Sequence, residues 1–162
     1  MRQDGGVIVF LCAACGTALT APVREVPLPP LDEAPLPFAV PDGEECPPRL
    51  APGTFAHDPE PYHLSWTHPP KGVPAPPVRP GSGLRSAVIG PDDVRGVEPI
   101  PRRRQGCCGP SGSQGPNLAC AGCGAEVAVE TADCYTPQQI TLDPRLTEPS
   151  ASAEPAAPPV PG

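Results

Sequence analysis

The sequence predicts a small, mostly-β protein with a zinc-ribbon-like core, long proline-rich irregular loops and a disordered C-terminal tail. Two observations lead to this fold class. A Cys-x-x-Cys-Gly pentad occurs twice between strand-like runs, and only about a fifth of the chain is Leu, Ile, Val or Phe, close to the limit for building a core. The 30 Pro and 17 Gly among 162 residues exclude a large α/β enzyme. The absence of a three-residue glycine period excludes collagen.

The N-terminal part, residues 5–26, is expected to form a hairpin around the first pentad. Residues 7–11 are β-branched and aromatic, which favours a strand, and residues 17–21 can return as its partner. Residues 27–82 are expected to be irregular, because 18 prolines between positions 22 and 80 remove amide donors and fix φ. No helix or central strand is expected there.

The segment 83–143 is expected to supply short strands and the second pentad. Strand-like runs occupy residues 86–89, 94–100, 117–119, 125–129 and 139–142. Residues 1–143 are therefore interpreted as a single small domain. Residues 144–162 are rich in Ala, Pro, Ser and Glu, a composition that predicts a disordered tail.

The two pentads are Cys12-Ala13-Ala14-Cys15-Gly16 and Cys120-Ala121-Gly122-Cys123-Gly124. Two residues between cysteines allow one tight turn to aim both sulfurs at an ion about 2.3 Å away. The glycine that follows can take a positive φ. Each pentad lies between strand-like runs, as a zinc knuckle does at the tip of a hairpin. Two knuckles would supply four thiolates, so we expect one structural Zn²⁺ bound by Cys12, Cys15, Cys120 and Cys123.

The remaining cysteines are Cys46, Cys107, Cys108 and Cys134. The last three are candidates for a second metal or thiol site. A competing assignment combines Cys134 and one residue of the Cys107-Cys108 pair with the second pentad. It would leave the first pentad to find other ligands, since spacing alone does not fix which cysteines share an ion. Cys46 stands alone in the proline-rich segment and is expected to take no part.

The expected function is non-catalytic zinc binding by an interaction or regulatory module. The alternative is a thiol redox or sensing protein that uses the loop around Cys107 and Cys108. A redox Cys-x-x-Cys motif needs a helix after it to lower a thiol pKa, and neither pentad precedes a helical pattern. No known signature of a catalytic cysteine surrounds the Cys107-Cys108 pair, so an enzyme is not expected.

The net charge of −7 disfavours binding to nucleic acid. The basic run Arg102-Arg103-Arg104 is expected to be a solvated loop. An unidentified protein partner is left open. Residues 7–23 carry no charge, but their apolar part is shorter than a membrane-spanning helix or a secretory segment requires. We therefore expect a cytoplasmic protein without a membrane partner.

Beyond the pentads themselves, four blocks of sequence are distinctive: residues 11–22, 52–56 with 58–61, 91–96 and 115–124. Together they resemble a group of uncharacterised actinobacterial proteins with paired CxxCG knuckles. The resemblance extends in scattered blocks over about residues 5–143. It implies no assigned activity. It does imply that the proline-rich middle of the chain contains folded loops.

Overall fold

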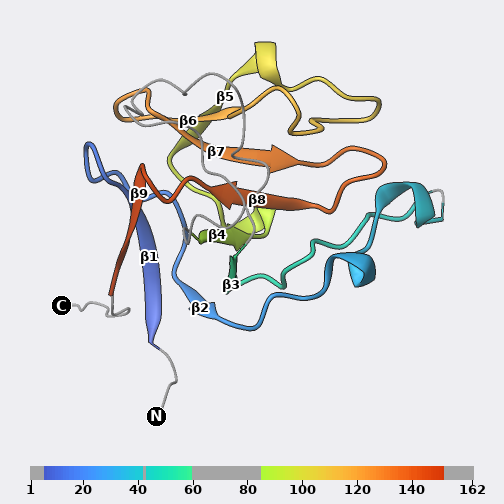
Figure 1. Ribbon diagram of the computed structural model, residues 1–162, viewed down its shortest axis with the longest axis horizontal. Coiled ribbons are helices and arrows are strands. Elements are labelled where there is room, and N and C mark those ends of the chain that lie inside the picture. Colours follow the sequence, from blue (N-terminus) through green and yellow to red (C-terminus); the bar gives the residue numbers. More distant parts are fainter. Residues whose placement is uncertain (1–5, 42, 60–84, 152–162) are drawn as a thin grey trace.

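The computed structural model of the chain describes residues 6–41, 43–59 and 85–151 (Figure 1). Within these ranges nine strands form one sheet in the order β5-β6-β7-β8-β4-β3-β2-β1-β9. The strands are β1 (Val7–Cys12), β2 (Val23–Glu25), β3 (Thr54–Asp58), β4 (Ser86–Ile89), β5 (Val97–Pro99), β6 (Leu118–Cys120), β7 (Glu126–Thr131), β8 (Gln139–Leu142) and β9 (Thr147–Ser150). β1 and β9 run steeply across the direction of β7 and β8 in Figure 1, so the sheet is curled. The prediction of a mostly-β fold is confirmed.

Most neighbouring strands pair antiparallel, as in the successive hairpins β6–β7 and β7–β8. β2 and β3 are an exception and pair parallel, with Arg24 opposite Thr54. β1 has two partners, since its first residues pair with β2 and its last four pair with β9. Residues 17–21, expected to return beside β1, make an isolated bridge between Ala18 and Leu11 rather than a strand.

The main core cluster draws on strands from distant parts of the sheet. It includes Phe10 of β1, Phe55 of β3, Ile89 of β4, Val127 of β7 and Ile140 of β8. The rings of Phe10 and Phe55 meet edge to face with their centroids 5.1 Å apart, which is a favoured aromatic geometry. Cys12 and Cys120 belong to the same cluster. Apolar packing therefore fixes the ends of β1 and β6, where the two pentads begin.

The helices in the described residues are short 3₁₀ turns. They include η1 (Leu31–Glu33), η2 (Pro37–Ala39), η4 (Pro91–Asp93) and η5 (Pro101–Arg103). Proline occupies the first position of η2, η4 and η5, where its missing amide donor costs no hydrogen bond. Among these described residues, no helix has the length and apolar character that crossing a membrane requires.

The proline-rich segment contains a central strand, which corrects the expectation for residues 27–82. β3 lies between β2 and β4, and its Phe55 and Ala56 are 1% and 0% exposed. The average proline density hid this strand, because residues 53–58 contain no proline and both Thr and Phe favour strands. The part of the expected irregular segment from residue 60 to residue 82 lies outside the described residues.

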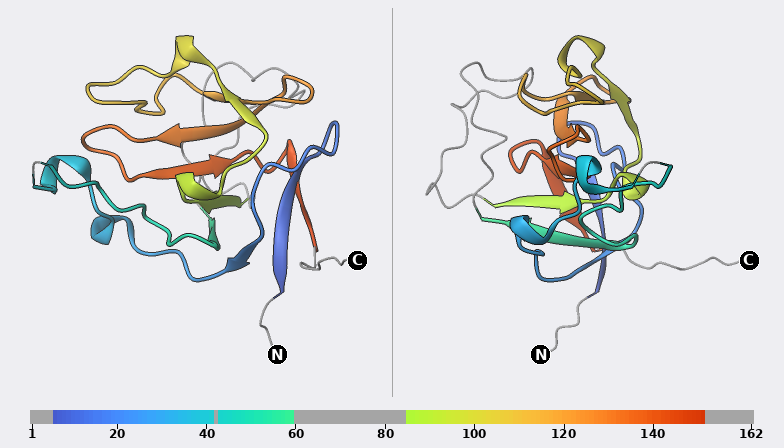
Figure 2. Two further views of the ribbon diagram at one scale, coloured as in Figure 1. Left: turned by 180° about the vertical axis from the view of Figure 1, so that it is seen from behind. Right: turned by 90° about the vertical axis from the view of Figure 1, so that its right-hand side faces the viewer.

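The C-terminal segment also departs from the expectation of disorder from residue 144. β9 pairs antiparallel with β1, from Thr147 opposite Cys12 to Ser150 opposite Val9, and Figure 2 shows the two strands side by side. Leu146, 6% exposed, anchors β9 to the main core. Composition averaged over the tail could not reveal one anchoring leucine. Residues 152–162 of the expected tail lie outside the described residues.

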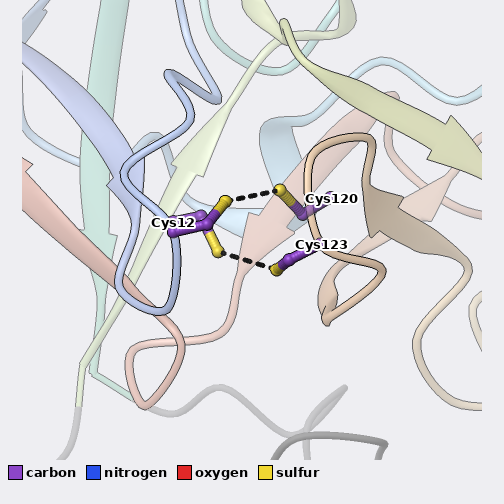
Figure 3. A group of neighbouring side chains, drawn as sticks. Cys12, Cys120 and Cys123 are labelled. Atoms are coloured by element: carbon purple, nitrogen blue, oxygen red, sulfur yellow. Dashed lines mark hydrogen bonds between the residues drawn. The ribbon is translucent and has the colours of Figure 1, made fainter.

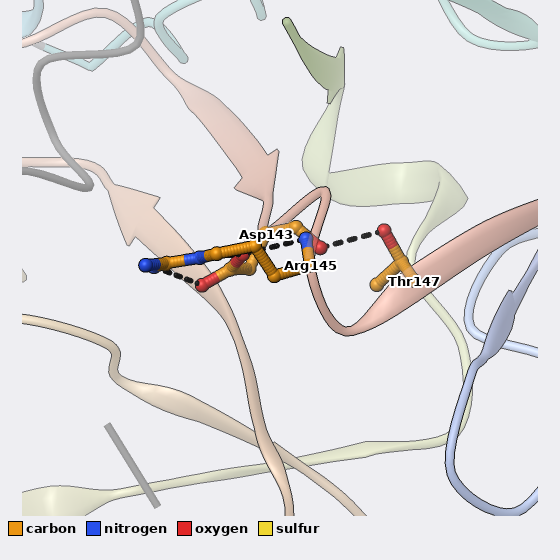
Figure 4. A network of polar contacts seen from close by, with 3 residues as sticks. All are labelled: Asp143, Arg145 and Thr147. Atoms are coloured by element: carbon orange, nitrogen blue, oxygen red, sulfur yellow. Dashed lines mark hydrogen bonds and ion pairs between the residues drawn. The ribbon is translucent and has the colours of Figure 1, made fainter. Parts of the chain in front are cut away.

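A turn at Asp143 directs the chain from β8 into β9 (Figure 4). The Asp143 carboxylate accepts hydrogen bonds from Nε of Arg145 at 2.9 Å and from its Nη2 at 2.8 Å, while Thr147 Oγ1 donates to the Asp143 carbonyl at 2.8 Å. Within this turn the Leu146 carbonyl accepts the N–H of Ala13 at 2.8 Å. The turn therefore also holds the loop that follows β1.

Asn117 extends the β6–β7 pairing with its side chain. The residue is fully buried. Its Oδ1 accepts the N–H of Glu130 at 2.7 Å, and its Nδ2 donates to the carbonyl of Glu130 at 2.9 Å. The amide thus replaces a backbone pair next to the register shift between Leu118 and Ala119. Both of these backbone groups of Glu130 are paired by this one side chain.

Replacing Asn117 by Ala is expected to lower the free energy of unfolding by about 2–4 kcal/mol, because two part-buried backbone groups lose their partner. Urea denaturation measures the loss. Asn117→Asp keeps an acceptor for the N–H but offers no donor to the carbonyl, so it is expected to be destabilised as well. Glu98→Ala, on the exposed edge strand β5, is the control and should change stability by less than about 0.5 kcal/mol. Similar stabilities for Asn117→Ala and this control would contradict the role given to Asn117.

Candidate metal centre

The two pentads form turns with the same backbone hydrogen bonds. In the first, the N–H of Gly16 donates to the carbonyl of Cys12 at 2.8 Å; in the second, the N–H of Gly124 donates to the carbonyl of Cys120, also at 2.8 Å. Both glycines have a positive φ, 82° and 84°, which residues with a Cβ resist. The first turn follows β1 and the second connects β6 to β7. The repeat in the sequence is therefore a repeat in structure.

The four pentad cysteines converge on one point. Their sulfurs all lie within 4.8 Å of one another, with Cys12 Sγ 3.7 Å from Cys123 Sγ and Cys15 Sγ 3.6 Å from Cys120 Sγ. A tetrahedral ion with sulfurs about 2.3 Å away places them about 3.8 Å apart. Figure 3 shows Cys12 of the first turn facing Cys120 and Cys123 of the second. The group could hold a metal ion.

Each turn contributes one buried and one exposed cysteine to this group. Cys12 and Cys120 end strands and are buried, whereas Cys15 and Cys123 are exposed. Burial raises the pKa of Cys12 to about 12. The Thr17 hydroxyl, whose Oγ1 lies 3.0 Å from Cys15 Sγ, lowers the pKa of Cys15 to about 6. A buried thiol such as Cys12 ionises readily only when a cation compensates its charge.

Glycines allow the two turns to approach each other. A Cβ on Gly122 would collide with Thr17 Oγ1 and lie 3.2 Å from Cys15 Sγ. Gly96, which has a φ of +63°, lies against Thr17 and the carbonyl of Ala18, and its own carbonyl accepts the N–H of Ala121 at 2.8 Å. Gly96 therefore lies between the two turns and contacts both. No spacing rule in the sequence indicated this glycine, because its contacts come from residues far along the chain.

The other cysteines lie elsewhere. Cys107, Cys108 and Cys134 form a separate group whose sulfurs are within 4.8 Å of one another, and Cys108 and Cys134 form a disulfide. The competing assignment, which combined these cysteines with the second pentad, is not the arrangement found. The disulfide was not foreseen, since no local motif links positions 26 residues apart. Cys46 is half-buried and its Sγ contacts the carbonyl of Pro47.

The run Arg102-Arg103-Arg104 forms ion pairs with β7 that were not expected from the sequence. Arg103 Nη1 lies 2.8 Å from Glu126 Oε1, and Arg104 Nη2 lies 2.8 Å from Glu130 Oε1, so η5 is held against β7. The side chains of Arg103 and Arg104 are each 24% exposed, while that of Arg102 is 67% exposed. The expectation of a solvated loop therefore fits Arg102 alone. The carboxylates of Glu126 and Glu130 on β7 pair with all three arginines, since Arg102 Nη2 also lies 3.6 Å from Glu126 Oε2.

Comparison with family models, curated proteins and solved structures finds no match for this chain. The resemblance to actinobacterial proteins with paired knuckles therefore stays a prediction. The case for a metal centre rests on the geometry of the four sulfurs and on the chemistry of thiolates.

Replacing Gly122 by Ala is expected to push the turns apart and weaken the sulfur group. The new Cβ would overlap Thr17, and overpacking of this kind costs about 1–3 kcal/mol. Resistance of bound metal to a competing chelator, measured alongside thermal unfolding, should fall in the variant. Gly6→Ala is the matched control, because Gly6 has no neighbour within 4 Å and no positive φ. Equal metal retention in Gly122→Ala and wild-type protein would contradict this account of the site.

Proposed function

We propose that the protein is a small, non-catalytic zinc-binding module in which Cys12, Cys15, Cys120 and Cys123 hold a structural Zn²⁺. The observation that supports it is the close grouping of the four sulfurs, all within 4.8 Å of one another and contributed in equal numbers by two matching turns. Knuckles at strand ends are the arrangement of a zinc ribbon. In this proposal the ion links the N-terminal strand β1 to the β6–β7 hairpin.

Zinc is the metal that this donor set favours. Thiolates select soft or borderline ions, and a tetrahedral set of four sulfurs is typical of Zn²⁺ or of iron–sulfur centres. Backbone donors support thiolate character here, since the N–H of Gly122 points at Cys120 Sγ at 3.3 Å. The S···S distances of 3.6 and 3.7 Å suit a single ion at the centre of the group.

The structural role follows from the coordination. Four protein ligands fill a tetrahedral site and leave no position for water or substrate, unlike catalytic zinc sites, which keep one open. Cys12 and Cys120 also belong to the main core cluster. Metal binding and core formation are therefore coupled, and binding free energy contributes to folding. A chain with so little Leu, Ile, Val and Phe gains most from such a centre.

An interaction or regulatory role in the cytoplasm is the setting we propose for this module. Thiolate centres persist where cysteines remain reduced, and a net charge of −7 favours a protein partner over nucleic acid. The alternative function, thiol chemistry at Cys107 and Cys108, uses other sulfurs and is compatible with the zinc centre.

Protein purified without chelator is expected to contain about one zinc per chain, measured by elemental mass spectrometry. Four thiols should resist alkylation until the metal is removed. Iron in place of zinc, with visible absorption, would mean an iron–sulfur centre. Folded protein without any metal would falsify the proposal.

Cys15→Ser and Cys123→Ser test the ligand set at its exposed positions, where a hydroxyl is tolerated and folding is least disturbed. Each is expected to weaken zinc affinity by more than about a hundredfold. That loss exceeds the one caused by removing only a hydrogen-bond partner of a metal ligand. Cys46→Ser is the control and should bind as the wild type does. Substituted Co²⁺ reports the number of thiolate ligands through its absorption spectrum. Unchanged spectra in both ligand variants would rule out these cysteines.

Removal of the metal under reducing conditions is expected to loosen the two turns before the rest of the sheet. Their exposed cysteines contribute no apolar packing, whereas the β7–β8 pairing is buried on both strands. After chelation, the backbone amides of Gly16 and Gly124 should exchange faster. The amides of Val129 and Thr141 should lose their protection more slowly. Identical protection with and without metal would contradict a structural role.

A further inference from the structure

The second cysteine group lies on two loops that face each other across the end of β7. Cys107 and Cys108 belong to the loop after η5, and Cys134 follows β7. Cys108 and Cys134 are bonded, and Cys107 Sγ is 3.8 Å from Cys108 Sγ. Cys107 and Cys108 are exposed and Cys134 is half-buried. A surface disulfide with a free thiol beside it is accessible to reagents in solution.

Asp133 holds the two loops together independently of the disulfide. Its Oδ1 accepts the N–H of Cys108 at 2.7 Å. The N–H groups of Cys108 and Cys134, with smaller contributions from those of Cys107 and Gly109, lower the pKa of the Asp133 carboxyl. The carboxylate is therefore charged at neutral pH and binds the backbone of the cysteine loop.

Glycines on both sides of the cysteine pair allow this close approach. A Cβ on Gly109 would lie 2.6 Å from the carbonyl of Ala132, and a Cβ on Gly106 would lie 2.8 Å from Asp133 Oδ2. The N–H of Ala132 also donates to the carbonyl of Pro110 at 2.8 Å. The two glycines that flank the cysteine pair are thus required by packing against residues 132 and 133. These contacts would keep the sulfurs close after the disulfide opens, which favours its re-formation.

The two cysteine groups differ in their chemistry. The pentad group has four sulfurs at non-bonded distances and suits an ion. The second group has three sulfurs, two of them bonded to each other, next to a carboxylate. In compartments where a thiolate zinc centre persists, most disulfides are transient and take part in exchange.

We propose that Cys107, Cys108 and Cys134 form a thiol–disulfide exchange site that reacts with a dithiol. One thiolate of the dithiol attacks the exposed Cys108 Sγ, forms a mixed disulfide and releases Cys134 as a thiolate, which takes up a proton. The second thiolate of the dithiol then attacks the other sulfur of the same dithiol, the one bonded to Cys108. Cys108 is released as a thiolate. Two electrons pass to the protein, and the dithiol becomes a cyclic disulfide. The reverse sequence oxidises the protein.

Cys107 gives the site a second way to bond Cys134. With the three sulfurs within 4.8 Å, the Cys107 thiolate attacks Cys134 Sγ, and the Cys108 thiolate leaves. This step transfers no net electrons, because one disulfide replaces another. Both of these oxidised forms therefore keep one exposed thiol, on Cys107 or on Cys108, available for exchange.

A redox titration tests the proposal on the full-length, zinc-loaded chain. The protein is equilibrated at a series of ratios of reduced to oxidised dithiothreitol, quenched with acid and alkylated. Mass spectrometry with fragmentation between Cys107 and Cys108 locates the free thiols. The ratio of reduced to oxidised protein should change about tenfold for each tenfold change in the dithiol ratio. If all three cysteines stay free thiols at every ratio of reduced to oxidised dithiothreitol, the proposal is overturned.

Variants distinguish exchange from simple crosslinking. Cys108→Ser is expected to form the Cys107–Cys134 disulfide, and Cys134→Ser to leave Cys107 and Cys108 as free thiols. Cys46→Ser is the matched control and should titrate as the wild type does. Absence of any disulfide in Cys108→Ser would contradict the role of Cys107. A second zinc per chain, lost in Cys134→Ser and retained in Cys15→Ser, would show that the group is a metal site and overturn the proposal.

Asp133 is a positioning residue for this equilibrium. In Asp133→Ala, half of the protein should be reduced at a ratio of reduced to oxidised dithiothreitol about tenfold lower than in the wild type. The disulfide is less favoured because the loop is no longer held near Cys134. Asp133→Asn keeps an oxygen acceptor for the Cys108 N–H and should restore most of the shift. A midpoint that is the same in Asp133→Ala and the wild type would remove Asp133 from the site.

Discussion

The close approach of the two cysteine turns is the constraint that joins β1 to the β6–β7 hairpin. Thr17 of the first turn lies against both Gly96 and Gly122, so a single side chain fills the space between the turns. Each turn is then supported from its own side. The Asp143 turn and β9 hold the first through the N–H of Ala13. The pairing of Arg103 with Glu126 braces the β6–β7 hairpin that carries the second.

Backbone context divides the cysteines into two kinds of chemistry. In the pentad turns, a glycine with positive φ follows each pair, and the sulfurs point toward a shared centre without touching. Around Cys108, glycines instead allow the loop to lie against Asp133, and the sulfur reaches Cys134. Glycine thus allows four sulfurs to gather at non-bonded distances in one place and a disulfide to form in the other. What differs is the group that the loop packs against.

The local features of this fold could be predicted from the sequence, and the long-range ones could not. The pentads and the strand at Ser86–Ile89 were recognisable because their signals lie within a few residues. β3 was missed because proline density was averaged across a long segment, although the six residues from Gly53 to Asp58 contain none. β9 was missed because its order depends on one buried leucine and on the open edge of β1. The Cys108–Cys134 pairing depends on a carboxylate that binds amides across two loops, which no spacing rule encodes.

The distance between the two turns along the chain has a consequence during synthesis. Cys12 and its neighbour Cys123 are 111 residues apart, and ribosomes add about 5–20 residues per second. The first turn therefore emerges roughly 5–20 seconds before its partner, with two thiols and no matching pair on the same chain. During that interval the nearest complementary turn can belong to another nascent copy. The four-cysteine group can therefore form within one chain only after β6 and β7 have left the ribosome.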